Sequence, residues 1–374
     1  MAKRANGEGS VYQRKDGRWA ASLSAGRGKR QHFLGKTRAD VSRKLNAALT
    51  GRDDGLPVIV ERQSVTKYLA SWLEAVRPSL RERTWVRYEE FVRLHIVPTL
   101  GKTPLTKLTP QHLQRLYAER LASGLSPTTV HHLHAVLHKA LDQALRWNLV
   151  ARNVSDLVDP PRITRHEMTT LSPESARTLL DAVSGQRLEA LYVLALTTGM
   201  REGELLGLKW ANVDFDGGAL EVRGSLQRLK AGLVVAEPKT SHSRRRVGLT
   251  QAALSALRRH RARQAAERLR LGAAWENDEL VFADEGGAPI DATRFLRNSF
   301  APLLKAAGLA PMRFHDLRHT AATLLLGRGV HPKIVSEMLG HSQIAITLDL
   351  YSHVTPTMQR EATAAMDAIV APQS

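Results

Sequence analysis

The stretch TTGMREGELLGLKW, residues 197–210, places an arginine between a glycine turn and a predicted helix. Arg201 follows Gly199 in the turn, and Glu204 stands three residues later in the helix. The first turn of a helix displays free backbone N–H groups that attract an anion, and a planar guanidinium can hold two phosphate oxygens at once. An arginine that pairs with a glutamate at i,i+3 gives the same pattern. The stretch alone therefore leaves an anion site and a simple ion pair open.

A second basic stretch, EPKTSHSRRRVGL, covers residues 237–249. Lys239 lies in a predicted β-turn, and three arginines follow it, Arg244, Arg245 and Arg246. A lysine on a loop can reach into a groove and deliver a proton. A run of charges in a loop is equally typical of a solvated surface, so both interpretations stay open for Lys239.

Two further stretches combine histidine with arginine or tyrosine. In FHDLRHT, His315 and Arg318 are three residues apart and share one face of a predicted helix. Because arginine does not ligate metals, this pair suits a phosphate better than a metal ion. In LGHSQIAITLDLYSH, Tyr351 follows His341 by ten residues. A tyrosine on an apolar helix is more often a core residue than a nucleophile, so this stretch needs the other three to support it.

The order and spacing of these residues resemble the catalytic set of the tyrosine recombinase (phage integrase) family. The surrounding stretches are similar as well: TTGMREGELLGLKW, the PKT of the predicted turn, FHDLRHTAAT and LGHSQI. The resemblance covers residue 171 to the C-terminus and extends, with weaker motifs, to residues 62–160, which resemble the core-binding domain. The first sixty residues look like the arm-binding domain of integrases that use accessory DNA sites. The catalytic positions are Arg201, Lys239, His315, Arg318, His341 and Tyr351.

The resemblance implies a reaction in which Tyr351 attacks a DNA phosphodiester, leaving a 3′-phosphotyrosyl bond and a free 5′-hydroxyl. Arg201 and Arg318 would bind the nonbridging oxygens, where charge develops in the transition state. His315 and His341 would add hydrogen bonds, and either could carry a proton.

Two more residues complete the implied mechanism. Lys239 would protonate the departing 5′ oxygen, and Glu204 would orient Arg201 or a neighbouring histidine. Because the covalent bond preserves the phosphodiester energy, the family resemblance implies strand exchange without ATP and without a metal. The sequence contains neither a G-x-x-x-x-G-K-[ST] loop nor an H-E-x-x-H motif. We therefore expect no cofactor and no metal site.

The composition favours a polyanionic partner. The chain has 374 residues, with 54 Lys+Arg against 36 Asp+Glu and a formal net charge of +18. Cations set against phosphates release condensed counterions, so this surplus favours nucleic acid, although acidic proteins and anionic membranes also bind basic proteins. The absence of cysteine excludes disulfides, thiolate zinc sites and cysteine nucleophiles. With no apolar run of about 18 residues and no apolar segment behind the basic N-terminus, we expect a soluble, nucleoid-associated protein of the bacterial cytoplasm.

The predicted fold class is mainly α with small β elements (α+β), in three domains. Residues 1–56 form the predicted arm-site DNA-binding domain, a three-stranded β unit with a helix. Residues 62–157 form a helical, SAM-like core-binding domain, and residues 158–170 a linker. Residues 171–374 form the catalytic domain, a mixture of helices and β-hairpins that ends in a C-terminal helix.

Turn residues and apolar spacing place individual elements. A KDG turn between Gln13 and Trp19 predicts a hairpin, and Gly26–Gly28 a second turn. A helix follows at residues 38–50, and RDDGLP at 52–57 reads as a linker. In the last domain the pattern predicts strands at 219–222, 233–235 and 246–249, and helices at 250–271, 314–327, 331–339 and 358–369.

Basic residues outside the catalytic set are predicted to contact DNA. Residues 1–60 hold 13 Lys+Arg against 5 Asp+Glu, a surplus that fits contact with phosphates. The predicted DNA contacts are Arg27, Lys29, Arg30, Arg244 and Arg245.

The family resemblance also implies how the chain meets its partner. Double-stranded DNA would be bound at core sites and at arm sites, with the helical and catalytic domains closing on it as a clamp. The protein would be a monomer free in solution and a homotetramer on DNA, with an accessory factor for excision. A C-terminal helix face would dock either on a neighbouring protomer or on its own domain, and the sequence leaves both open. This face contains Met358, Ala362, Ala365, Met366 and Ile369.

Other classes of DNA protein share part of this pattern. A type IB topoisomerase resembles the family in fold and catalytic set, but the basic N-terminal unit argues against it. A chromosome-dimer resolvase is a closer relative that usually lacks such a unit. A regulator with a vestigial catalytic set would not be expected to keep every catalytic position filled. A metal-dependent transposase would need clustered carboxylates, and the sequence shows no convincing group.

Overall fold

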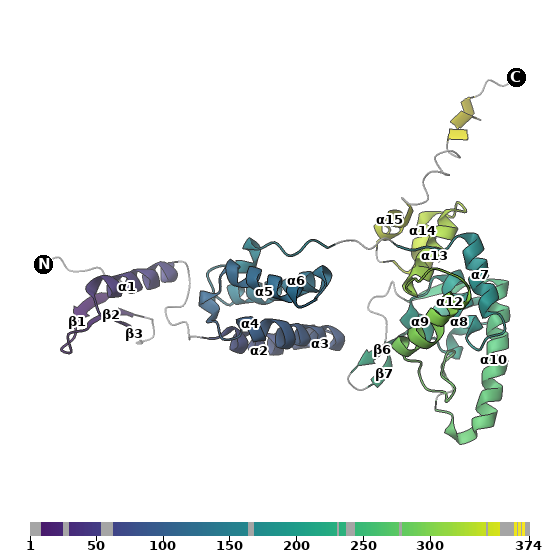
Figure 1. Cartoon of the computed structure of the whole chain (residues 1–374), viewed down its shortest axis with the longest axis horizontal. Helices are drawn as coiled ribbons and strands as arrows, with labels where there is room; N and C mark the ends of the chain where they lie inside the picture. Colours follow the sequence, from purple (N-terminus) through teal and green to yellow (C-terminus); the bar gives the residue numbers. More distant parts are fainter. Residues whose placement is uncertain are drawn as a thin grey trace. The chain divides into compact units, whose positions relative to one another are not determined.

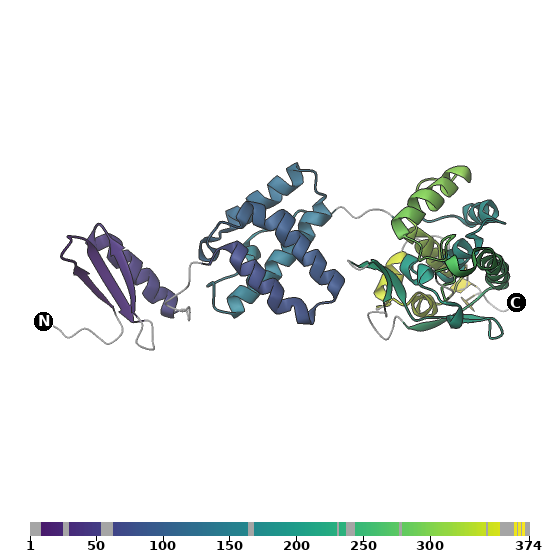
Figure 2. The ribbon, with the colours of Figure 1, turned by 90° about the horizontal axis from the view of Figure 1, so that it is seen from below.

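The computed structural model divides the chain into two compact units, residues 1–165 and 166–374 (Figures 1 and 2). Within the described part of the chain, no helix is both long and apolar enough to cross a membrane. The structure describes residues 9–24, 30–53, 63–163, 168–229, 232–236, 244–276, 279–341 and 343–351, and in the C-terminal segment residues 363–364, 366–367 and 369–370.

The first unit begins with a three-stranded antiparallel sheet that carries a helix on one face (Figure 2). The predicted hairpin is confirmed: β1 (Ser10–Gln13) pairs with β2 (Trp19–Ser24), and Gly17 in the turn has a φ of 77°, a value that suits glycine. β3 (Arg30–Gly35) pairs with the other edge of β2, and α1 (Arg38–Asp53) covers the sheet. A small core joins β2 to α1, formed by Ala21, Leu23, Val41 and Leu45.

In this region one predicted helix has a different end, and one predicted turn cannot be compared with the structure. The helix α1 extends to Asp53, past its predicted end at residue 50 and into the predicted linker. The predicted turn at Gly26–Gly28 lies outside the described residues.

Residues 63–163 form helices around one hydrophobic core. The side chain of Ser126 caps α6 by accepting a hydrogen bond from Thr129 N, and Pro127 occupies the first turn. Trp72 is buried and stacks on Tyr88 with ring centroids 5.8 Å apart. The helices are α2 (Val65–Val76), α3 (Glu82–Glu90), α4 (Val97–Leu100), α5 (Pro110–Ala122) and α6 (Pro127–Arg146), with short turns of other helix types at η1 (Arg77–Ser79), η2 (Phe91–Ile96), η3 (Leu105–Lys107) and η4 (Val154–Leu157).

The second unit is built around α8 (Glu189–Thr198), in which every residue except Thr197 is buried. A helix that is buried on all sides belongs in the middle of a domain, and α7, α10 and α13 pack against it (Figure 1). The other helices are α7 (Pro173–Val183), α9 (Glu202–Leu206), η5 (Trp210–Asn212), α10 (Gln251–Leu271), η7 (Gly272–Ala274), α11 (Ala292–Phe295), η8 (Leu296–Phe300), α12 (Ala301–Ala306), α13 (His315–Leu326), α14 (Pro332–Leu339) and α15 (Ala345–Tyr351).

Two small antiparallel sheets accompany these helices, in the orders β4-β5-β8 and β6-β7. The three predicted strands are confirmed within a residue or so as β5 (Ala219–Val222), β7 (Gly232–Ala236) and β8 (Arg245–Gly248). The strands β4 (Val213–Asp214) and β6 (Ser225–Leu229) were not predicted. In β6 the two leucines stand three residues apart, so the alternation typical of a strand is missing.

Three of the four helices predicted in the last domain are also confirmed. Those at 250–271, 314–327 and 331–339 are confirmed as α10, α13 and α14. The helix predicted at 358–369 lies largely outside the described residues. The mainly helical α+β fold class is confirmed.

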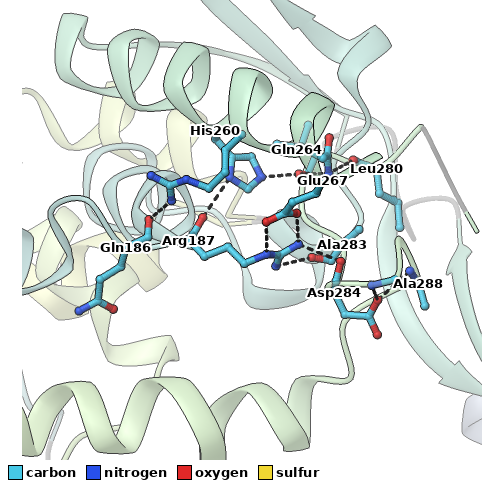
Figure 3. Close-up of polar contacts among 12 residues, drawn as sticks. Gln186, Arg187, His260, Gln264, Glu267, Leu280, Ala283, Asp284 and Ala288 are labelled. Atoms are coloured by element: carbon cyan, nitrogen blue, oxygen red, sulfur yellow. Dashed lines mark hydrogen bonds and ion pairs between the residues drawn. The ribbon is translucent and has the colours of Figure 1, made fainter. Parts of the chain in front are cut away.

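A polar network fastens α10 to the segment 280–288 (Figure 3). Arg187 donates from Nε and Nη2 to the carboxylate of Glu267, over 2.9 and 2.8 Å, and from Nη1 to Ala283 O. His260 is buried, with Nε2 2.7 Å from Val281 O. Gln264 Nε2 donates to the same carbonyl. Among the described residues, no side-chain polar atom of these four residues is both buried and without a partner. We call Arg187, His260, Gln264 and Glu267 the Arg187 network.

Candidate active site

Arg201 stands directly before α9, where the sequence predicts a helix start. Gly199 ends α8 with a φ of 60°, and a Cβ there would lie 2.3 Å from Leu339 Cδ2, so the turn requires glycine. Arg201 N donates to Glu204 Oε2 over 3.0 Å, and its Nη1 donates to Oε1 over 2.7 Å. Its Nη2 donates to Gly340 O over 3.0 Å. The i,i+3 ion pair is therefore present, and it fixes Arg201 against the turn before His341.

Arg318 lies on the first turns of α13 and is 3% exposed. Its Nη1 donates to Gly199 O over 2.8 Å, whereas its buried Nη2 has no hydrogen-bond partner among the described residues. Burial and the neighbouring charge of Arg201 lower the pKa of Arg318 to about 9. The group still carries its charge at neutral pH, with one donor nitrogen left open.

The two predicted histidines lie beside these arginines. Loss of water around the ring, followed by the positive charges of His319 and Arg318, lowers the pKa of His315 to about 4. Loss of water also lowers the pKa of His341, to about 3, with Arg318 and then Arg201 as further causes. Both rings are therefore neutral at pH 7 in the free protein. They can donate a hydrogen bond to an anion without adding another buried charge.

His341 is connected to the helix that carries Tyr351. Its Nδ1 lies 2.8 Å from Thr347 Oγ1, and Thr347 on α15 is fully buried. Tyr351 ends α15 four residues later; its backbone belongs to the described part of the chain, and its side chain does not. Thr347 was not singled out in the sequence, although its i,i+4 spacing to Tyr351 could have drawn attention to it.

Glu204 is shared between two guanidinium groups. Arg245 Nη2 lies 2.8 Å from Glu204 Oε2, and Arg201 holds Oε1. Burial raises the pKa of Glu204, but the hydrogen bonds and charges of Arg245 and Arg201 outweigh it, so the pKa is below its ordinary value. The carboxylate is therefore ionised. We call Arg201, Arg245 and Arg318 with Glu204 the arginine cluster.

Of the remaining predicted residues, some belong to the described part of the chain and others do not. Arg245, which the sequence predicts as a DNA contact, has a side chain that is only 7% exposed and is bound to Glu204. Arg244 stands just before β8, and Arg30 is exposed at the start of β3. Lys239, Arg27 and Lys29 lie outside the described residues.

The cluster has the character of an anion site. It brings three guanidinium groups around one carboxylate, a surplus of two positive charges, and adds neutral histidines at its edge. Within the described part of the chain, no group of three or more histidine and acidic side chains is placed to hold a metal ion. Open donors on positively charged groups suit a phosphate oxygen. The fold and the site thus have the features of a protein that binds an anion such as a phosphate.

Comparisons with known proteins agree with this class. A model of the phage integrase family matches residues 164–358, and a model of the phage integrase N-terminal SAM-like domain matches residues 64–121. A tyrosine recombinase XerC-like protein of Caldanaerobacter subterraneus subsp. tengcongensis is 34% identical over 353 residues, which cover 89% of this chain and 90% of that protein. An integrase of Streptomyces ambofaciens is 31% identical over 390 residues, 99% of this chain and 98% of that protein.

Solved structures share the fold. The Tn1549 transposon integrase in complex with a circular intermediate DNA has a TM-score of 0.68 at 23% identity and covers 81% of this chain and 99% of its own. A lambda integrase tetramer bound to a Holliday junction has a TM-score of 0.58 at 18% identity, with 93% and 96% covered.

The chain belongs to the phage integrase family of tyrosine recombinases. It is an enzyme of site-specific recombination, which cleaves DNA strands and rejoins them through a phosphotyrosyl intermediate, the reaction of this family in phages and other mobile elements.

Proposed function

We propose that this recombinase uses Tyr351 as its nucleophile and the arginine cluster as the site of the scissile phosphate. The observation that carries the proposal is the buried Nη2 of Arg318, which has no partner among the described residues. Buried polar groups in folded proteins nearly always find a partner. A nonbridging phosphate oxygen supplies the missing acceptor, and Arg201, 39% exposed at its side chain, can turn toward a second oxygen.

The reaction follows from the chemistry of these groups. The phenol of Tyr351 gives its proton to His315 or His341 and its oxygen attacks phosphorus, the bond to the 5′ oxygen breaks, and Lys239 gives that oxygen its proton. Charge that develops on the nonbridging oxygens is stabilised by Arg201 and Arg318. His315 and His341 are neutral in the free enzyme, and a bound phosphate raises their pKa because the anion favours the imidazolium.

Rejoining reverses these steps. A 5′-hydroxyl gives its proton to Lys239 and attacks phosphorus, the bond to Tyr351 breaks, and the histidine returns its proton to the phenol oxygen. The bond energy of the phosphodiester is kept throughout, so we expect neither a nucleotide cofactor nor a metal.

We further propose that three domains share the DNA. Residues 62–157 and 171–374, joined by the linker 158–170, would close on the core site. Residues 1–56 would contact arm sites, through Arg27, Lys29 and Arg30. The exposure of Arg30 and the local surplus of positive charge support this assignment. Arg244, just before β8, would add a phosphate contact. With this substrate, we propose that the enzyme acts at the chromosome, in the bacterial cytoplasm.

The chain is proposed to act as a homotetramer on DNA and as a monomer without it. Lambda integrase is described as a dimer bound to a core site and as a tetramer bound to a Holliday junction. Met366 and Ile369 are 57% and 74% exposed, which supports docking of the C-terminal segment on a neighbouring protomer. An accessory factor for excision completes the proposal. Removal of residues 358–374 should abolish recombination and spare binding to a single core site.

Covalent capture tests the nucleophile. The protein is incubated with fragments of the DNA that flanks its own gene and denatured in detergent, and the attached DNA is sequenced, with Tyr351→Phe treated in parallel. Adducts with the wild type alone, and a phosphotyrosyl peptide that contains Tyr351, are the expected result. DNA binding without any adduct from the wild type would instead favour a DNA-binding regulator.

A further inference from the structure

We infer that Arg245 is a positioning residue for the recombination reaction, which occupies Glu204 and supports the turn before His341 so that Arg201 stays available to the phosphate. The inference rests on the proposed function. Arg245 belongs to β8, and its guanidinium uses all three nitrogens in protein contacts. Nε donates to Met338 O over 2.7 Å, and Nη1 and Nη2 donate to Glu204 over 3.2 and 2.8 Å. A residue held this way is not directed at DNA.

The alternation of β8 separates Arg245 from its neighbour. Arg245 is 7% exposed at its side chain, whereas Arg246 is 57% exposed and pairs over 2.7 Å with Asp214, which is 46% exposed. Successive side chains of a strand point to opposite faces. The two arginines therefore form a natural pair for experiment, one buried in the cluster and one on the surface.

The electrostatic role of Arg245 follows from the single carboxylate between two cations. Glu204 receives Arg201 on one side and Arg245 on the other. Without Arg245, the carboxylate would have Arg201 as its remaining cationic partner in the cluster, and the positive surplus of the cluster would fall by one charge. Arg201 would then be held by Glu204 at the cost of its contact with phosphate.

The turn that carries His341 is shaped around the same guanidinium. Gly340 has a φ of 68°, and a Cβ there would lie 3.0 Å from Arg245 Nη1 and 3.1 Å from Arg245 Cδ. Gly340 O also accepts the hydrogen bond of Arg201 Nη2. A single backbone turn therefore touches Arg201 and Arg245 and leads directly into His341. Arg245 also stands six residues after Lys239, the proposed acid, on the next described strand of the chain.

The test separates chemistry from DNA binding. With the core-site duplex recovered by covalent capture, the rate of adduct formation at saturating DNA and the Kd are measured for wild type, Arg245→Gln, Arg245→Lys and Arg246→Gln. We expect Arg245→Gln to lower the rate about 100-fold, the effect of a small misplacement at an active site, with the Kd within about threefold. Arg245→Lys keeps the charge without the planar fork of the guanidinium, so its rate should lie between those of wild type and Arg245→Gln. Arg246→Gln, the matched control, should behave as wild type.

Two further variants keep the test decisive if Arg245→Gln is unstable. Gly340→Ala leaves the charge in place but crowds the guanidinium, and it should lower the rate at saturating DNA with little change in Kd. In Glu204→Gln/Arg245→Gln no carboxylate remains to hold Arg201 away from the phosphate, so the double variant should be no slower than Glu204→Gln alone.

Each other outcome overturns something specific. A weaker Kd with an unchanged rate at saturation would make Arg245 a DNA contact, and equal rates for Arg245→Gln and wild type would remove its role in the reaction. In both cases the proposed function stands. No adduct from the wild type would overturn the proposed function itself, and the inference with it.

Discussion

The Arg187 network and the arginine cluster lie in the same unit, and each gathers arginine around one buried or half-buried carboxylate. Arg187 and Glu267 face each other in parallel, and the free positions of the guanidinium are taken by backbone carbonyls. In the arginine cluster Glu204 is equally well bound, by Arg201 and Arg245. There, however, Arg318 Nη2 is buried without a partner among the described residues, as is Nδ1 of the nearby His319.

This difference separates a structural polar network from a ligand-binding site. A network whose members are all satisfied stabilises the arrangement of its elements. A cluster that carries surplus charge and open donors has a cost in the free protein that a ligand can remove. The two clusters therefore make opposite predictions for stability and for activity.

The largest effect is expected from Arg318→Ala. Loss of a guanidinium that stabilises a phosphoryl transition state costs about 10³–10⁵-fold in rate. Removal of a buried, partly unsatisfied cation should at the same time leave the free energy of unfolding unchanged or higher. Single-turnover adduct formation and urea unfolding measure the two quantities. If the variant unfolds easily and cleaves at the wild-type rate, Arg318 stabilises the fold, as Arg187 does, and does not act on the phosphate.

The reverse is expected from Arg187→Met. It leaves Glu267 without its cation, and the free energy of unfolding should fall by about 3 kcal/mol, the lower end for a buried pair because Arg187 is 23% exposed. Adduct formation by the folded fraction should not change. The double variant Arg187→Met/Glu267→Leu is the control, since replacement of both charges should recover most of the loss. A slower reaction in the folded fraction would connect this network to catalysis.

A smaller effect is expected at Thr347, which connects α15 to His341. Thr347→Val keeps the shape of the side chain but removes the hydrogen bond, whose typical worth of about 1 kcal/mol corresponds to a rate loss of about fivefold to tenfold at saturating DNA. Thr347→Ser keeps the hydroxyl and should stay closer to wild type. If Ser and Val variants react equally slowly, packing rather than the hydrogen bond connects the two residues.

The last effect concerns pH and is measured as a change in stability. His341 has a pKa of about 3 in the folded protein, lowered by burial and by Arg318 and Arg201, and a free histidine titrates near 6.5. Between these values the unfolded chain binds a proton that the folded chain excludes, so stability falls as the pH drops from about 6.5 toward about 3. His341→Gln should flatten this fall in urea unfolding measured at pH 7 and pH 5. An unchanged slope would contradict the lowered pKa.

The sequence anticipates much of this site because its motifs stand at the ends and the starts of helices. Gly199 and Gly340 end helices in the left-handed conformation, and Arg201 and His341 follow at fixed offsets. The roles of Arg245 and Thr347 depend on contacts with residues 41 and 6 positions away, Glu204 and His341. A period-2 reading of the arginine run at 244–246 could have separated a buried arginine from an exposed one. It could not have named the carboxylate that binds it.

The strands of the catalytic unit show the same limit. Where apolar and β-branched residues run together, as in GLVVA of β7, the prediction succeeds. In SLQRL of β6, the pairing with β7 supplies what the local pattern lacks. Register between strands is a tertiary property, and the composition of a single strand does not determine it.

The central claim is that the arginine cluster is a phosphate site and not a structural polar network. An uncharged scissile linkage tests this claim most directly. The core-site duplex carries a methylphosphonate at the scissile position, and the rates of adduct formation by wild type and Arg318→Ala are compared with those on the normal phosphate. If Arg318 neutralises the phosphate, the defect of Arg318→Ala should shrink from about 10³-fold or more to a few-fold on the neutral linkage. An equally large defect on both substrates would contradict the account, because Arg318 would then act on the fold and not on the charge of the DNA.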